Sequence, residues 1–137
     1  SRDRGHNSLP YSLPPPAGGA ENPEILKEAY ALNEPLFAMP VKKQGGSLPA
    51  EYSFITSSTP SVVPETLKAA EDGKGVIVRL LETKGTHTEA ALTFGTAPKT
   101  VTLTNILEDK LSEIPVKNGG IKLTFHPFEI KTIRLTF

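Results

Sequence analysis

An apolar run in the middle of the chain constrains its fold more than any other feature. Residues 75–83 read Gly-Val-Ile-Val-Arg-Leu-Leu-Glu-Thr, and apolar side chains fall on both alternating faces of this run. A β-strand built from it would be covered on both sides. We therefore expect the run to form the central strand of an all-β domain. Arg79 and Glu82 are costly to bury unless they are paired, so each should find a partner or reach the rim of the sheet.

The chain is long enough for one domain with one core. At 137 residues, folding buries roughly two-thirds of the surface of the unfolded chain. The 15 basic and 15 acidic side chains balance, and Lys and Arg form no cluster. This balance argues against nucleic acid or an anionic membrane as a partner. No apolar run approaches the ~20 residues that span a bilayer. The chain has no cysteine, so it has neither a disulfide framework nor a thiolate metal site.

The first 22 residues predict an extended connector arm. Prolines at positions 10 and 14–16 and the glycines at 18 and 19 deny the backbone both helix and ladder hydrogen bonds. We therefore divide the chain into an arm of residues 1–22 and a β-sandwich domain of residues 23–137. The sequence Asn22-Pro23-Glu24 is a helix start signal, and Pro35 ends the helix by Asn33. One short helix of two or three turns is expected here.

Short apolar segments separated by turn residues predict the strands. These segments are residues 36–41, 52–56, 62–71, 75–83, 89–94, 100–107, 121–125 and 128–137. Residues 64–70 also suit a helix, but Asp72-Gly73 is a hairpin signal that favours a strand before it. Exposed loops are expected at residues 42–49 and 108–110. Seven or eight strands spaced at about 8 to 12 residues predict a two-layer antiparallel β-sandwich.

The last segment has an irregular apolar pattern. Its apolar positions change phase between Ile130 and Ile133. Such a one-residue slip predicts a β-bulge or a strand that crosses from one layer to the other.

The polar residues predict no catalytic, cofactor-binding or metal-binding site in this chain. His6, His87 and His126 stand far apart with no carboxylate at a recurring ligand spacing, so no zinc site is expected. We expect His87 in a surface turn and His126 in a hydrogen-bonded structural role. No pair of carboxylates can be placed ~5 to 9 Å apart, as glycoside chemistry requires. The acids considered are Glu82, Glu89, Glu108, Asp109, Glu113 and Glu129.

Three further sequence features are better explained by structure than by a functional site. Gly73-Lys74-Gly75 precedes a strand, whereas a phosphate loop follows one, so turn chemistry is favoured. No serine lies in a nucleophile-elbow pattern. Arg79 is expected to bridge to a carboxylate such as Glu129 or Glu82, with ligand binding as the alternative.

Four blocks of sequence carry a signal that periodicity does not. They are Glu28-Ala-Tyr-Ala-Leu-Asn-Glu-Pro-Leu36, Val76-Ile-Val-Arg-Leu-Leu-Glu82, Thr104-Asn-Ile-Leu-Glu108, and Pro127-Phe-Glu-Ile-Lys-Thr132 with Arg134-Leu135. These blocks resemble the C-terminal end of family 38 α-mannosidases, particularly the cytosolic and bacterial branch. Their order and spacing match that family across nearly the whole chain.

The segment upstream of these blocks matches the family less closely. Asp3, Gly5, residues 11–13 and Pro15 fit it. Asn7, Leu9 and Pro15-Pro16 stand where the family usually shows His, Phe and a Pro-His pair. These departures leave open any role of the arm near a sugar.

The resemblance implies retaining hydrolysis of α-mannosides by an aspartate nucleophile near a bound zinc ion. It places those groups in an N-terminal catalytic domain and a helical segment that are absent from this chain. We expect a non-catalytic C-terminal domain that supports the catalytic domain, with loops able to wall its cleft. Its partners would be that domain and, through the parent enzyme, mannosides. The chain alone is expected to be inactive and to hold no cofactor.

Two expectations concern compartment and an alternative function. The absence of cysteine is compatible with a reducing compartment, and residues from Ser1 onward show no signal-peptide pattern. We therefore expect a cytoplasmic location. The alternative function is an independent carbohydrate-binding or adhesion-type β-sandwich. Such a module would need exposed aromatic side chains on a strand face or loop.

Overall fold

The computed structural model describes residues 13, 22–34, 36–43 and 45–137. The chain divides into two compact units, Ser1–Gln44 and Gly45–Phe137. The first unit holds helix α1 (Pro23–Asn33), and the second holds every strand of the described chain. Most of the predicted arm, residues 1–22, lies outside the described residues. The division at residues 22 and 23 therefore stays a prediction.

Helix α1 forms for the reasons that the sequence suggested. The Asn22 side chain accepts a hydrogen bond of 3.0 Å from the backbone N–H of Glu24, and Pro23 occupies the first helical position. This arrangement satisfies a helix-end donor that would otherwise lack a partner. The helix has 11 residues, about three turns. Among the described residues, no helix is long and apolar enough to cross a membrane.

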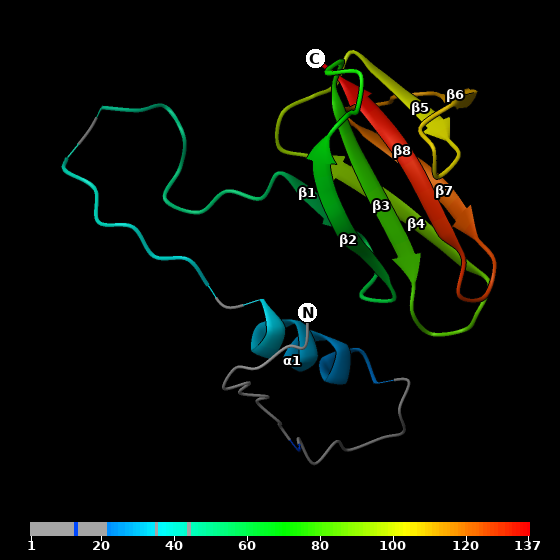
Figure 1. Ribbon diagram of the computed structural model, residues 1–137, viewed down its shortest axis with the longest axis horizontal. Helices are drawn as coiled ribbons and strands as arrows, with labels where there is room; N and C mark the ends of the chain where they lie inside the picture. The colour runs from blue at the N-terminus through cyan, green and yellow to red at the C-terminus, as the bar shows by residue number, and fades with distance from the viewer. Residues whose placement is uncertain (1–12, 14–21, 35, 44) are drawn as a thin grey trace, which may run out of the picture. The chain divides into compact units, whose positions relative to one another are not determined.

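Eight strands in the described residues form two antiparallel sheets, which confirms the predicted all-β sandwich. The smaller sheet has the order β1-β4-β7, and the larger has the order β2-β3-β8-β5-β6. In Figure 1, β4 and β7 cross behind β3 and β8. The strands are β1 (Ile55–Ser57), β2 (Val62–Ala69), β3 (Val76–Glu82), β4 (Thr88–Phe94), β5 (Thr100–Thr104), β6 (Lys110–Ile114), β7 (Gly120–Phe125) and β8 (Ile130–Thr136).

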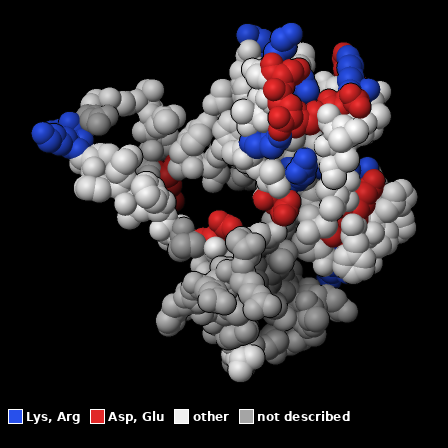
Figure 2. All heavy atoms as spheres, viewed as in Figure 1, with Lys and Arg blue, Asp and Glu red and all other residues white. Residues whose placement is uncertain are grey.

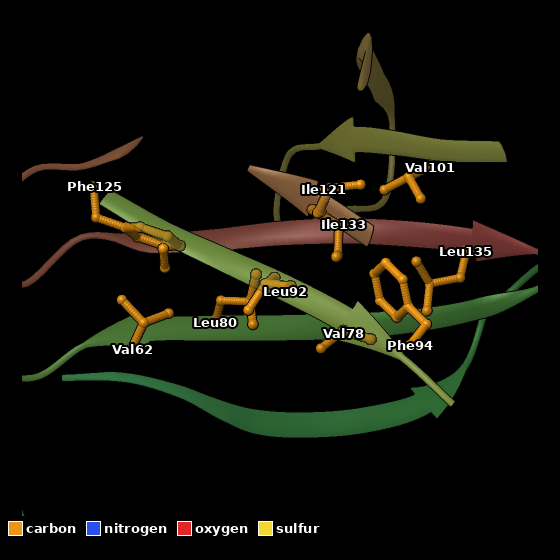
Figure 3. Packing of buried hydrophobic residues seen from close by; sticks show 11 residues of the cluster. Val62, Val78, Leu80, Leu92, Phe94, Val101, Ile121, Phe125, Ile133 and Leu135 are labelled. Atoms are coloured by element: carbon orange, nitrogen blue, oxygen red, sulfur yellow. The ribbon is translucent and has the colours of Figure 1, made fainter. Parts of the chain in front are cut away.

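The hydrophobic core lies between the two sheets. Figure 3 shows Val78 and Leu80 of β3 turned toward Leu92 and Phe94 of β4. Strand β3 pairs with β2 on one side and β8 on the other, so it is a central strand as predicted. Burying each large apolar side chain stabilises the fold by about 1.5–3 kcal/mol. The buried cluster consists of Val62, Val78, Leu80, Ala90, Leu92, Phe94, Val101, Ile121, Phe125, Ile133 and Leu135.

Residues 36–41 form no strand, so that prediction is wrong. Leu36 and Phe37 are at least 90% exposed, and Met39 and Val41 are also exposed. Apolar alternation favours a strand only where a sheet face is available to pack against.

Strand β6 was missed because its sequence lacks apolar alternation. Four of its five residues are exposed, so the strand is held mainly by its ladder with β5, and only Ile114 packs against the core. The predicted surface loop at residues 108–110 overlaps its start. Strand β5 ends at Thr104, which leaves Leu107 in a loop.

Strand β8 is regular, and the predicted bulge or layer crossing in the last segment is wrong. It pairs with β3 without interruption from Ile130 to Leu135. The apolar pattern changes phase because Ile130 faces away from the core, whereas Ile133 and Leu135 face into it. The register shifts occur elsewhere, between Pro64 and Thr66 in β2 and between β5 and β6.

Candidate functional site: the outer face of the five-stranded sheet

The structure brings two of the three histidines together. His87 and His126 flank the cross-strand pair Thr88 and Phe125, and their ring centroids lie 5.0 Å apart with an interplanar angle of 76°. Sequence reasoning kept them apart because strand register cannot be read from residue spacing. His6 lies outside the described residues. Among the residues that the structure describes, no three His, Cys, Asp or Glu side chains are placed to hold a metal ion.

Glu82 is a fully buried carboxylate that joins two turns. It accepts backbone hydrogen bonds from Lys84 at 3.1 Å, Gly85 at 2.8 Å and Phe128 at 3.0 Å. Thr86 and Thr88 donate further bonds from their hydroxyls. The prediction that Glu82 finds partners is thus confirmed, but the partners are N–H and O–H groups instead of a cation.

These hydrogen bonds keep Glu82 ionised in spite of its burial. Burial raises the pKa of its carboxyl, but backbone N–H groups led by that of Phe128 outweigh this effect, and the pKa lies below its usual value. Glu82 is therefore a structural acceptor and is unsuited to donate a proton near neutral pH.

A second buried carboxylate, Glu108, connects distant strands on the outer face of the five-stranded sheet. Its side chain accepts a 2.9 Å hydrogen bond from the backbone N–H of Glu71 and forms a 2.9 Å ion pair with Lys68 on β2. Arg134 on β8 donates to the Glu108 backbone carbonyl at 3.3 Å and pairs with Asp72 at 2.7 Å. The backbone N–H of Glu71, followed by Lys68, holds the pKa of the Glu108 carboxyl below its usual value.

The side chains of Glu108, Lys68 and Arg134 together explain the burial of Ile77. Ile77 is opposite Lys68 in one ladder and Arg134 in the other, and Glu108 contacts both of them. The stems of Lys68 and Arg134 flank Ile77, whose exposed fraction is 0%. Strand β3 is therefore covered on its second face at Ile77, as its sequence predicted. Figure 2 shows acidic and basic side chains gathered at the upper end of the sandwich.

Arg79 lacks the carboxylate partner that the sequence predicted. Within the described part of the chain it forms no ion pair, and its buried Nε has no hydrogen-bond partner. Glu82 lies on the opposite face of β3 and is occupied by the turns, whereas Glu129 pairs with Lys131 at 2.7 Å. The expected bridge from Arg79 to Glu82 or Glu129 is therefore wrong. In the ladders, Arg79 lies between Thr66 and Thr132.

An apolar row runs across the same outer face. Val63, Leu81 and Ile130 are direct cross-strand neighbours on β2, β3 and β8. Val63 and Leu81 are half-buried, and Ile130 is 59% exposed. Phe128, in the turn before β8, is 67% exposed, and its ring lies close enough to Gly85 that a Cβ there would come within 2.6 Å. Apolar and charged groups on this side of β3 are therefore not fully covered by other described residues.

Three hollows on the described surface offer no aromatic stacking platform. Their volumes are about 600, 530 and 320 Å³. The first and third lie along β4 and β7, and the second lies beside Glu108 and Arg134. Tyr, Phe and Trp are absent from the linings of these three. A sugar ring in any of them would lack the aromatic face that an independent carbohydrate-binding module needs.

Two packed antiparallel sheets around one core define this chain as a β-sandwich domain. It belongs to the glycosyl hydrolases family 38 C-terminal beta sandwich domains, whose family model matches residues 61–133. This match covers β2 to β7 and the first half of β8, and it confirms the resemblance noted in the sequence.

Three curated relatives are similar over almost the entire chain. Alpha-mannosidase 2C1 of Homo sapiens is 30% identical and that of Mus musculus is 31% identical, each over 97% of this chain. Alpha-mannosidase G of Dictyostelium discoideum is 30% identical over 96% of it. The chain spans only 13% of the human and mouse proteins and 12% of the Dictyostelium protein.

Proposed function

We propose that this chain is a non-catalytic C-terminal β-sandwich of an α-mannosidase whose remaining part performs retaining hydrolysis of α-mannosides. One observation carries the proposal: the match covers 97% of this chain but only 13% of α-mannosidase 2C1. Most of the length of such a protein lies outside this domain and can hold the groups that bind and cleave the sugar.

The role of the sandwich in this proposal is mechanical support of the catalytic part. Supporting evidence is the apolar row of Val63, Leu81 and Ile130 on the outer face of the sandwich, where Ile130 is 59% exposed. A domain that packs against a larger body exposes such surface when it is viewed alone.

Zinc and the aspartate nucleophile belong, in this proposal, to the catalytic part outside this chain. The described residues do not fit a zinc site, because His87 and His126 have no third ligand near them. We therefore assign no step of the reaction to a metal held by these residues. A cytoplasmic location is part of the same proposal and can be tested by cell fractionation.

The test is an activity assay of the purified 137-residue chain with an aryl α-mannoside. We expect cooperative unfolding and β-sheet circular dichroism, because the buried cluster of the described residues lies within residues 45–137, together with no turnover. The positive control is the full-length parent enzyme. Turnover that remains after a second purification and co-elutes with the chain would reject the proposal.

The second candidate function is an independent carbohydrate-binding module, which the exposed ring of Phe128 favours. Isothermal titration of the chain with mannose oligomers separates the two. Micromolar binding that is lost in Phe128→Ala would support the module, whereas no heat at millimolar oligomer favours the supporting domain.

A further inference from the structure

We propose that the catalytic part of the α-mannosidase docks on the outer face of the five-stranded sheet and presents a carboxylate to Arg79. We call this surface the Arg79 face and define it as Arg79, Val63, Leu81, Phe128 and Ile130. The inference rests on the function proposed above and specifies the surface through which the sandwich contacts its partner.

The first argument is the arrangement of the apolar side chains. An antiparallel sheet with one solvated face usually alternates apolar residues inward with polar residues outward. Here Val63, Leu81 and Ile130 lie directly opposite one another on the outward side of three adjacent strands. Single exposed apolar residues are ordinary, but a contiguous row across three strands indicates a surface that another body covers. The exposed ring of Phe128, two residues before Ile130, adds to the apolar groups at this end of β8.

The second argument compares two arginines on the same face. Arg134 on β8 has carboxylate partners in both Asp72 and Glu108. Arg79 on the neighbouring strand has none among the described residues. The buried Nε of each arginine lacks a hydrogen bond, so the two differ in their carboxylate partners. A partly buried guanidinium without a counter-charge is costly, and a carboxylate can bind it through two parallel hydrogen bonds.

The third argument is that the nearby acids of this chain are already engaged. Glu108 and Asp72 bind Lys68 and Arg134, and Glu65 accepts a 2.7 Å bond from the Thr66 hydroxyl. No ion pair among the described residues includes Arg79, and we infer that its counter-charge comes from the partner. An acidic side chain bordered by apolar groups on the partner complements both Arg79 and the apolar row.

The experiment uses the full-length parent α-mannosidase with a photo-crosslinking amino acid in place of Ile130. Its matched control carries the same amino acid in place of Lys122, an exposed residue on the outer face of the three-stranded sheet. We expect mass spectrometry to find cross-links from position 130 to residues upstream of this chain, at a yield at least tenfold above position 122.

A charge reversal tests the role of Arg79. In the full-length enzyme, Arg79→Glu should speed proteolytic release of the sandwich at least tenfold, and Arg79→Lys should restore part of the protection. In the 137-residue chain alone, Arg79→Glu should leave the midpoint of unfolding nearly unchanged, since Arg79 has no ionic partner there. This second measurement separates lost docking from misfolding.

Several results would overturn the inference. Cross-links from position 130 to residues 23–43 would mean that this chain covers its own face, and links to a second copy would indicate a homodimer. Cross-links from position 122 alone would show that the interface lies on the three-stranded sheet, and the proposed function would still stand. Equal rates of proteolytic release of the sandwich from wild type and from Arg79→Glu would contradict a partner carboxylate at Arg79. Failure of the proposed function itself has a different readout, namely mannoside turnover by the isolated chain.

Discussion

At the scale of single residues, the two buried carboxylates are the polar groups that define the domain. Sequence reasoning recognised that Glu82 needs partners, since it lies in an apolar strand. It could not identify Phe128 as a donor, because that contact joins residues 46 positions apart. It also placed Glu108 in a surface loop, although the side chain is buried. For Arg79 the sequence suggested a partner within the chain, which the described structure does not provide.

Replacing Glu82 with Gln should destabilise the domain strongly. The amide keeps one acceptor oxygen, and in either orientation its NH₂ faces a backbone donor, Lys84 on one side or Gly85 and Phe128 on the other, so at least one donor is left unsatisfied. We expect a loss of about 2–4 kcal/mol in the free energy of unfolding, measured by urea denaturation. The control is Glu113→Gln on exposed β6, which should change stability far less, because that side chain is exposed. Similar losses in both variants would argue against the role given to Glu82.

Acid should weaken the domain through the same carboxylates. Folding lowers the pKa of Glu82 and of Glu108 relative to the unfolded chain. Their stabilising contribution is therefore fully present above the unfolded pKa and is lost as the pH falls through the folded pKa. Urea midpoints should stay level from pH 7 toward 5.5 and then decline below about 4.5.

The Glu82→Gln variant supplies the check on this pH profile. Because Gln does not titrate, the variant should lose less stability than the wild type between pH 5 and 3. Parallel profiles for the two proteins would assign the acid sensitivity to other groups.

At the scale of secondary-structure elements, burial decided which strands the sequence could reveal. Strands β3, β4 and β7 place buried side chains on the core face at alternate positions, and this pattern is visible in the sequence. Strand β6 has no buried residue and left no pattern. Residues 36–41 have the pattern without the strand, because apolar alternation alone does not supply the neighbouring strands that a β-strand requires.

At the scale of the whole molecule, the fold class followed from turn spacing and alternation, whereas the layer arrangement did not. No local signal tells that β8 lies between β3 and β5, or that the sheets hold three and five strands. Those facts depend on contacts between segments far apart in the chain. The family followed from blocks of residues, such as 76–82 and 127–132, and not from the physics of the strands.

The contacts of Glu108 have a consequence for how the larger sheet opens. An open sheet ordinarily frays one outermost strand at a time. Here Glu108, two residues before β6, binds Lys68 and Glu71 at the opposite border of the sheet. The two borders should then open in a single event. Hydrogen exchange can test this: Glu108→Gln should speed exchange of amides in β6 and around Glu71 together, by about tenfold or more, while Glu113→Gln should speed neither. Faster exchange confined to β6 would show that its border opens alone.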